Sequence, residues 1–304
     1  MAIAGDTYEF HEKAFYDLTV PIAAIETIYD GCRWSEGPVW FNDGGYLIWS
    51  DIPNNRMLRW VPESGVTVYR QPSNYVNGNT RDLEGRMVSC SHGARAVLRT
   101  EPDGTITTLV SHHQGKRLNS PNDVVVRSDG TIWFTDPTYG IISDYEGYKA
   151  DPEQDGCFVY RYDPQTDTLD VVTKDFTKPN GLAFSIDETQ LFIADSGKSH
   201  DPDCASVIRC YDTDGKTLSN GRVFCELETG IPDGFRFDTN GNLWTSAGAG
   251  INCYDPAGTL LGRINLPQSV SNLTFGGERR NRLFITSTQA VYSVFVGATG
   301  AQRP

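Results

Sequence analysis

The sequence of 304 residues has no long hydrophobic run, and its mainly apolar stretches reach only five or six residues, as in LFIAD from Leu191. A membrane-spanning helix needs roughly 20 apolar residues, so we expect no such span. Basic residues are also scarce, because 26 Lys and Arg stand against 39 Asp and Glu. The resulting net charge of −13 repels nucleic-acid phosphates and anionic lipids. We therefore expect neither a nucleic acid nor a membrane as a partner.

Closely spaced cysteine pairs are absent as well. Of the seven cysteines, no two have the two-residue separation of a zinc knuckle or a redox motif. The N-terminal segment MAIAGDTYEF has charged residues where a secretory signal needs its apolar part. These features favour a reduced, cytoplasmic protein without a targeting segment. Since no linker or shift of composition divides the chain, we expect one domain over residues 1–304, with residues 1–24 as an N-terminal extension.

What the sequence does contain is a short strand pattern that occurs six times. The copies start 40, 45, 59, 52 and 40 residues apart, and most of them follow a turn signal such as NDGG or SDG. Further short segments with alternating apolar residues lie around each copy, which makes four strands in most units. The six copies are YLIWSD, RMVSCS, TIWFTD, QLFIAD, NLWTSA and RLFITS.

Four-stranded units that repeat at roughly 40–50 residues are typical of β-propellers. We therefore predict an all-β fold, a six-bladed β-propeller with four-stranded blades. The last unit supplies only three strands, and the N-terminal segment IETIY, from Ile25, is predicted to provide the fourth and to close the ring. The long connection over residues 136–156 is interpreted as a surface loop or a lid over one mouth of the ring.

The innermost strands of a propeller line a central channel, and their first residues face the same mouth. For blade two the predicted inner segment is TRDLEG, with Arg81 or Asp82 at the mouth. Oxygen-bearing side chains begin the inner segments of four other blades. They are Glu36 in SEGPVW, Asn122 in SPNDVV, Asn180 in KPNGLAF and Asp233 in IPDGFRF.

These four residues indicate a cation site, although each of them alone is also a common turn residue. Two converging carboxylates repel each other unless a cation lies between them. Glu36 and Asp233, together with two neutral amide oxygens, form a hard, all-oxygen site of charge −2 that suits Ca²⁺ or Mg²⁺. We expect one divalent cation as cofactor, with Ca²⁺ as the first choice and Mg²⁺, Mn²⁺, Zn²⁺ or Fe²⁺ as alternatives.

Longer motifs resemble the gluconolactonase family, also called the SMP-30 or regucalcin-like family: SEGPVW, NDVVVRSDGTIWFTDPTYG, PNGLAFS and PDGFRFDTNGNLW. The similarity extends from about Ile25 to Phe295. It implies a six-bladed propeller with one divalent metal, whose ligands fall on Glu36, Asn180 and Asp233. The resemblance places Asn122 near the metal, the water or the substrate. It also implies hydrolysis of sugar lactones, whereas related propellers hydrolyse organophosphates or act on other esters.

On this basis we expect a lactonase in which the metal polarises the lactone carbonyl and Asp233 takes a proton from the attacking water. A role of Asp233 as nucleophile is the alternative. Asn122, Arg117, His92 and Tyr139 are candidates for contact with the substrate, although the last three also suit ordinary structural roles. An organophosphate or ester hydrolase with the same site, and a non-catalytic calcium-binding propeller, are the other functions considered. The protein is expected to be a monomer or a homodimer.

Overall fold

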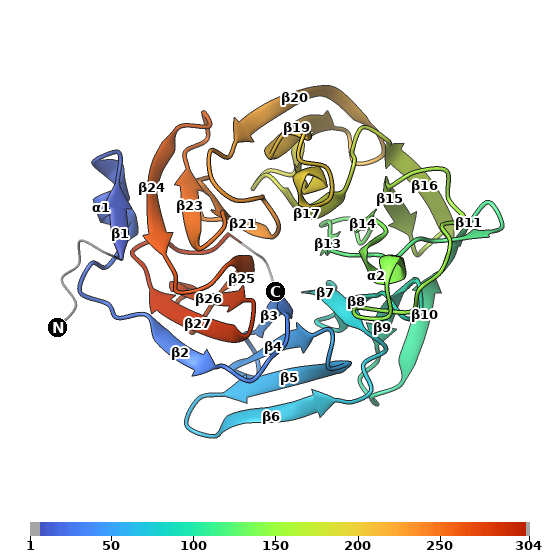
Figure 1. Ribbon diagram of the computed structural model, residues 1–304, viewed down its shortest axis with the longest axis horizontal. Helices are drawn as coiled ribbons and strands as arrows, with labels where there is room; N and C mark the ends of the chain where they lie inside the picture. The colour runs from blue at the N-terminus through green and yellow to red at the C-terminus, as the bar shows by residue number, and fades with distance from the viewer. Residues whose placement is uncertain (1–6, 302–304) are drawn as a thin grey trace.

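The computed structural model describes residues 7–301, which form short antiparallel strands for the most part. Six sheets lie around a central axis (Figure 1), and they confirm the predicted six-bladed β-propeller. A small separate hairpin consists of β11 (His112–His113) and β12 (Lys116–Arg117). Within the described residues, no helix combines the length and the apolar character that crossing a membrane demands.

The first two strands of each blade lie nearest the central channel (Figure 1). Each inner strand pairs antiparallel with the strand that follows it along the chain. The inner strands are β3 (Ser35–Phe41), β7 (Val76–Arg81), β13 (Val124–Val126), β17 (Pro179–Phe184), β21 (Phe235–Phe237) and β25 (Val270–Gly276). The second strands are β4 (Tyr46–Asp51), β8 (Met87–Ser91), β14 (Ile132–Asp136), β18 (Gln190–Asp195), β22 (Leu243–Ser246) and β26 (Arg282–Ser287).

The outer two strands complete each blade and lie towards the rim (Figure 1). The third strands are β5 (Arg56–Val61), β9 (Ala96–Thr100), β15 (Phe158–Asp163), β19 (Val207–Thr213), β23 (Gly250–Tyr254) and β27 (Ala290–Phe295). The fourth strands of the first five blades are β6 (Gly65–Arg70), β10 (Ile106–Val110), β16 (Thr168–Thr173), β20 (Leu218–Glu226) and β24 (Leu260–Asn265).

The N-terminal segment completes the sixth blade. Strand β2 (Glu26–Tyr29) pairs antiparallel with β27, so the predicted closing strand is confirmed. An additional strand, β1 (Tyr8–Phe10), pairs with β24 and gives blade five a fifth strand that the sequence did not predict. The short helix α1 (Ala14–Leu18) follows it and buries Phe15. Part of the predicted extension, residues 1–6, lies outside the described residues.

Hydrophobic side chains between neighbouring blades form the core. Trp49, Trp133 and Trp244 lie on the second strands of blades one, three and five and are fully buried. Trp244, for example, packs with Leu273 and Phe275 of blade six. Burial of an aromatic side chain of this size removes a large apolar area from water. Packing between blades therefore stabilises the ring and holds the inner strands around the channel.

The inner strand of blade two differs from the prediction. It is β7, with the sequence VNGNTR, and the predicted segment TRDLEG overlaps only its last two residues and continues into a turn. Asp82 accepts hydrogen bonds from the backbone N–H groups of Glu84 and Arg86 in that turn, and neither Arg81 nor Asp82 lines the central cavity. The apolar alternation used for the prediction fails here because this strand is mostly polar.

Candidate active site

The starts of the inner strands meet at one cavity of about 490 Å³. Glu36 and Asn180 are the second residues of β3 and β17, while Asn122 and Asp233 each lie two residues before the short strands β13 and β21. All four side chains line the cavity, so the structure brings the four predicted oxygen ligands together. They come from four different blades, and therefore the closed ring is required to assemble them.

Backbone contacts between blades fix the position of these residues. The N–H of Gly181 donates to the carbonyl oxygen of Asp233 at 3.1 Å, and a Cβ atom at Gly181 would collide with that oxygen. Blade four can approach blade five this closely only because residue 181 has no side chain. The Thr135 hydroxyl donates to the carbonyl of Asn180 at 2.8 Å in the same way, from blade three to blade four. The site residues are thus held by their main chains.

A fifth cavity residue, Asn77, was missed by the sequence analysis. Asn77 is followed by Gly78 in blade two, just as Glu36, Asn180 and Asp233 are each followed by a glycine. Strands β3, β7 and β17 each carry one extra residue opposite the second strand at this point, which is a β-bulge. The shared X-Gly dipeptide at the mouth of the channel was the signal that could have identified Asn77.

The two carboxylates of the site affect each other strongly. Burial raises the pKa of Glu36 to about 8, and the neighbouring Asp123 carboxylate adds to this effect. Burial also raises the pKa of Asp233 well above its ordinary value, and the negative charge of Glu36 raises it further. Without a compensating positive charge, at least one of the two carboxylates therefore holds a proton at neutral pH.

A second polar cluster surrounds the Glu36 side chain. The Asn272 amide lies with Nδ2 at 3.3 Å from Glu36 Oε2 and 3.5 Å from Asp123 Oδ2. Asp123 is buried, and the Arg236 guanidinium lies 3.9 Å from its carboxylate. Asp123, next to the predicted residue Asn122, was not among the residues predicted from the sequence. This cluster fixes one side of the Glu36 carboxylate and leaves its other oxygen atom free of these amide contacts.

The donor set suits a hard divalent cation. It offers two carboxylates and the side-chain oxygens of Asn122 and Asn180, and the Asn180 Nδ2 group donates to Ser196 Oγ at 3.0 Å. That hydrogen bond turns the Asn180 oxygen away from Ser196. Within residues 7–301, no group of three His, Cys, Asp or Glu side chains is placed to hold a metal. Amide oxygens must therefore complete this set.

We expect Ca²⁺ to stabilise the protein more at about pH 8 than at about pH 5.5. In the metal-free protein, the pKa of Glu36 lies near 8 instead of near 4.5. Between these values the folded state retains a proton that the unfolded chain has lost, so stability falls as the pH rises. A cation binds the ionised carboxylates and opposes this fall. Thermal unfolding with Ca²⁺ or EDTA at both pH values measures the effect, and equal shifts at both would contradict it.

The connection between β14 and β15 covers one side of the cavity. It contains the helix α2 (Tyr139–Ile142), and Tyr139, Ile142, Tyr145 and Glu146 line the cavity. The segment therefore lies where a lid was predicted. The Tyr139 hydroxyl lies 3.0 Å from Ser199 Oγ, close to the short helix η1 (Gly197–Ser199) of the next blade. Burial raises the pKa of the Glu146 carboxyl to about 7.

Two of the predicted substrate contacts lie outside the cavity lining. Arg117 is held by other parts of the chain, since its backbone N–H donates to Glu153 Oε2 at 2.8 Å and its guanidinium to the Ala94 carbonyl at 3.1 Å. His92 is buried behind the wall of the cavity. Its position after strand β8 suggested that it could line the mouth, whereas in the structure it is buried with its ring nitrogens beside Asn77 and the Glu146 carbonyl. Of the predicted substrate contacts, Asn122 and Tyr139 line the cavity.

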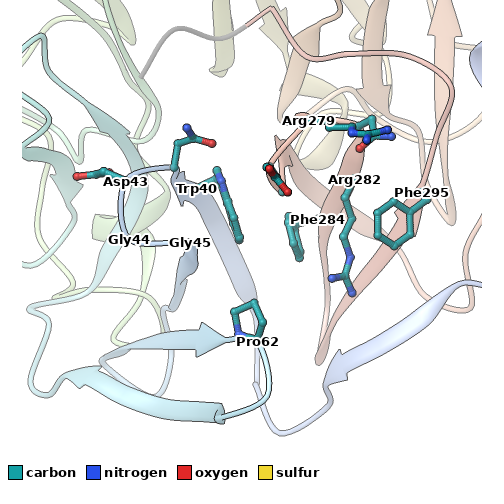
Figure 2. Close-up of a pocket in the computed structure, with 13 residues that line it drawn as sticks. Trp40, Asp43, Gly44, Gly45, Pro62, Arg279, Arg282, Phe284 and Phe295 are labelled. Carbon is teal, nitrogen blue, oxygen red and sulfur yellow. The ribbon is translucent and has the colours of Figure 1, made fainter.

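A larger groove of about 900 Å³ lies between blades one and six (Figure 2). It is lined by the turns that follow β3 and β25 and by aromatic side chains such as Trp40 and Phe284. These turns lie at the opposite ends of the inner strands from Glu36 and its partners. The groove contains none of the predicted site residues, so we place the chemistry in the central cavity.

Comparison with known proteins identifies the family of the chain. Residues 34–289 match the family model described as the SMP-30/Gluconolactonase/LRE-like region. The chain belongs to this family. A gluconolactonase of Zymomonas mobilis is 34% identical over 92% of this chain and 83% of its own length. A pentonolactonase of Haloferax volcanii is 28% identical over 84% of this chain and 82% of its own length.

The fold similarity extends to solved structures of the family. A gluconolactonase from Xanthomonas campestris superposes with a TM-score of 0.90 at 37% identity, covering 96% of this chain and 95% of the other. The family resemblance inferred from the motifs SEGPVW, PNGLAFS and PDGFRF is therefore confirmed.

Proposed function

We propose that the protein is a divalent-metal-dependent lactonase that opens sugar lactones of the glucono type to aldonic acids. The observation that carries this proposal is the convergence of Glu36, Asn122, Asn180 and Asp233 in one cavity beneath a covering segment. Its relatives include a gluconolactonase and a pentonolactonase, which supports a lactone as the substrate. A small, neutral and polyhydroxylated ring also suits a cavity of about 490 Å³.

Glu36, Asn180, Asp233 and Asn122 are proposed to hold the cation. All four offer oxygen atoms, which favours Ca²⁺ and leaves Mg²⁺, Mn²⁺, Zn²⁺ or Fe²⁺ as alternatives. When bound, the ion acts as a Lewis acid on the carbonyl oxygen of the lactone. Its positive charge also allows both carboxylates to be ionised in the same cavity.

Asp233 is proposed to act as the general base. Its backbone N–H donates to Ser246 Oγ at 2.8 Å and its carbonyl accepts from Gly181, so the residue has a fixed place at the channel mouth. The ionised carboxylate takes a proton from water as the water oxygen bonds to the carbonyl carbon. The ring C–O bond then breaks, and Asp233 returns the proton to the ring oxygen, which becomes a hydroxyl group. The product is the open-chain acid.

A substrate series tests this function. Acid release above the spontaneous rate is measured for D-glucono-1,5-lactone, for a pentono-1,4-lactone, for an aryl ester and for an organophosphate triester. We expect sugar lactones to be hydrolysed with the highest kcat/KM, because the cavity wall offers several polar groups to ring hydroxyls. Faster hydrolysis of the triester or the ester would contradict the assignment. Ca²⁺ binding without hydrolysis of any of the four compounds would point to a calcium-binding propeller instead.

A further inference from the structure

Asn77 is a buried amide on the cavity wall that the proposed cation site does not use. Its backbone carbonyl is fixed by Ser50 Oγ at 2.7 Å and by Asn79 Nδ2 at 3.0 Å. A polar side chain in such a place is costly unless its hydrogen-bonding groups have partners. The nitrogen and the oxygen of the Asn77 amide therefore each need a hydrogen-bond partner.

The nitrogen end of the amide faces His92. Asn77 Nδ2 lies 3.3 Å from His92 Nε2, and the other ring nitrogen, Nδ1, lies 2.9 Å from the backbone carbonyl oxygen of Glu146. A carbonyl oxygen only accepts, so Nδ1 carries the proton and donates to Glu146. In the neutral ring Nε2 is then an acceptor, and it receives the N–H of Asn77. Burial lowers the pKa of His92 to about 4, which keeps the ring neutral.

The oxygen end of the amide is available to a molecule in the cavity. Within residues 7–301, the Oδ1 atom of Asn77 accepts no hydrogen bond, whereas its Nδ2 group is committed to His92. Because the residue lines the cavity and His92 lies behind the wall, the oxygen is directed towards a bound molecule. A lone acceptor in this position fits an O–H donor of the molecule.

His92 also connects this amide to the covering segment. A Cβ atom at Gly140 would collide with the His92 side chain, so the segment packs directly on the ring. The Nδ1 hydrogen bond to Glu146 fastens the same segment a few residues further on. A single imidazole therefore holds both the cover of the cavity and the orientation of the Asn77 amide.

We propose that Asn77 is a specificity-determining residue whose Oδ1 atom accepts a hydrogen bond from one ring hydroxyl of the lactone, and that His92 is the positioning residue that orients it. This inference rests on the proposed lactonase function. A site that bonds one substrate hydroxyl discriminates against the analogue lacking it, because the buried acceptor then remains unpaired. Asn77 thus distinguishes polyhydroxylated lactones from simple ones.

The test combines enzyme variants with substrate variants. We compare kcat/KM of the wild type, Asn77→Leu and Asn77→Ala for D-glucono-1,5-lactone and for its single deoxy analogues at positions 2, 3, 4 and 6. Both substitutions remove the acceptor, and the two new side chains differ in volume. If one variant does not fold, the other still gives the result. We expect kcat/KM of both Asn77 variants to be about tenfold below that of the wild type for the parent lactone. For one of the deoxy analogues, the variants and the wild type should have the same kcat/KM. Asn42→Leu, on the outer groove, is the matched control.

His92→Phe tests the positioning role. It removes both hydrogen bonds of the ring but keeps its approximate shape. We therefore expect kcat/KM of this variant for the same deoxy analogue to equal its kcat/KM for the parent lactone, with Ca²⁺ affinity unchanged. An equal loss on all five lactones for both Asn77 variants would overturn the proposal and show a structural role only. Absence of hydrolysis by the wild type would instead refute the proposed function, so the two failures are distinguishable.

Discussion

Replacing Asp233 by Asn lowers kcat for sugar lactones by about 10³-fold, within the usual range for loss of a general base. The amide has the size of the carboxylate and keeps an oxygen for the cation, but it cannot take a proton from water. We therefore expect Ca²⁺ binding to weaken and yet remain measurable. The measurement is acid release at saturating substrate, together with a calorimetric Ca²⁺ titration of the same preparation.

The control for this variant is Asp17→Asn, at an exposed position on α1. It makes the same chemical change far from the channel and is expected to leave kcat unchanged. Activity of Asp233→Asn equal to the wild type would remove Asp233 from the catalytic machinery. Loss of activity together with complete loss of Ca²⁺ binding would assign Asp233 to the cation alone.

Replacing Glu36 by Gln is expected to weaken Ca²⁺ binding by more than about 100-fold, since changes even to residues that support metal ligands cost 10–100-fold. The substitution removes one of the two negative charges of the donor set. It also removes the repulsion that raises the pKa of Asp233. In the absence of Ca²⁺ the variant should therefore be at least as stable as the wild type at about pH 8.

Two measurements check the Glu36 variant. Calorimetric titration gives its Ca²⁺ affinity, and thermal unfolding in EDTA gives its metal-free stability. Glu12→Gln, at an exposed position before α1, is the matched control. An unchanged Ca²⁺ affinity of Glu36→Gln would exclude Glu36 as a ligand. Lower metal-free stability than the wild type would contradict the repulsion between the two carboxylates.

The blade repeat was visible in the sequence because second strands such as YLIWSD are apolar and bounded by turns. The inner strand of blade two was missed for the opposite reason. Most residues of β7 are polar, and Asn79, for example, is buried with its side chain hydrogen-bonded to Gly37, Ser50 and Ser89. Such a strand is buried without being hydrophobic, so the apolar alternation that identifies other strands is absent.

The site residues were predicted where the inner strand after them is apolar, as for Asn180 in KPNGLAF. Asn77 was missed, although a glycine follows it, because its strand is mostly polar. Asn122 is followed by Asp123, and both lie before the regular alternation of β13 begins, so neither side chain follows the period of two. From the sequence, Arg117 was a candidate substrate contact because it lies five residues before Asn122, and His92 was one because it follows the SCS strand of blade two. The hydrogen bonds that hold these two residues are made with Glu146, Glu153 and Ala94, which belong to other segments and become neighbours only in the folded ring.

The central claim is that the ring directs its oxygen ligands at one cation that is required to open lactones. The most direct test measures acid release from D-glucono-1,5-lactone by one protein preparation in three states. These are the protein as purified, the protein after treatment with EDTA, and the treated protein after addition of Ca²⁺ in excess over EDTA. We predict loss of the enzymatic rate to the spontaneous level in EDTA and its recovery with Ca²⁺ or another divalent ion. A rate that stays unchanged after EDTA, in protein shown to be free of metal, would contradict the account.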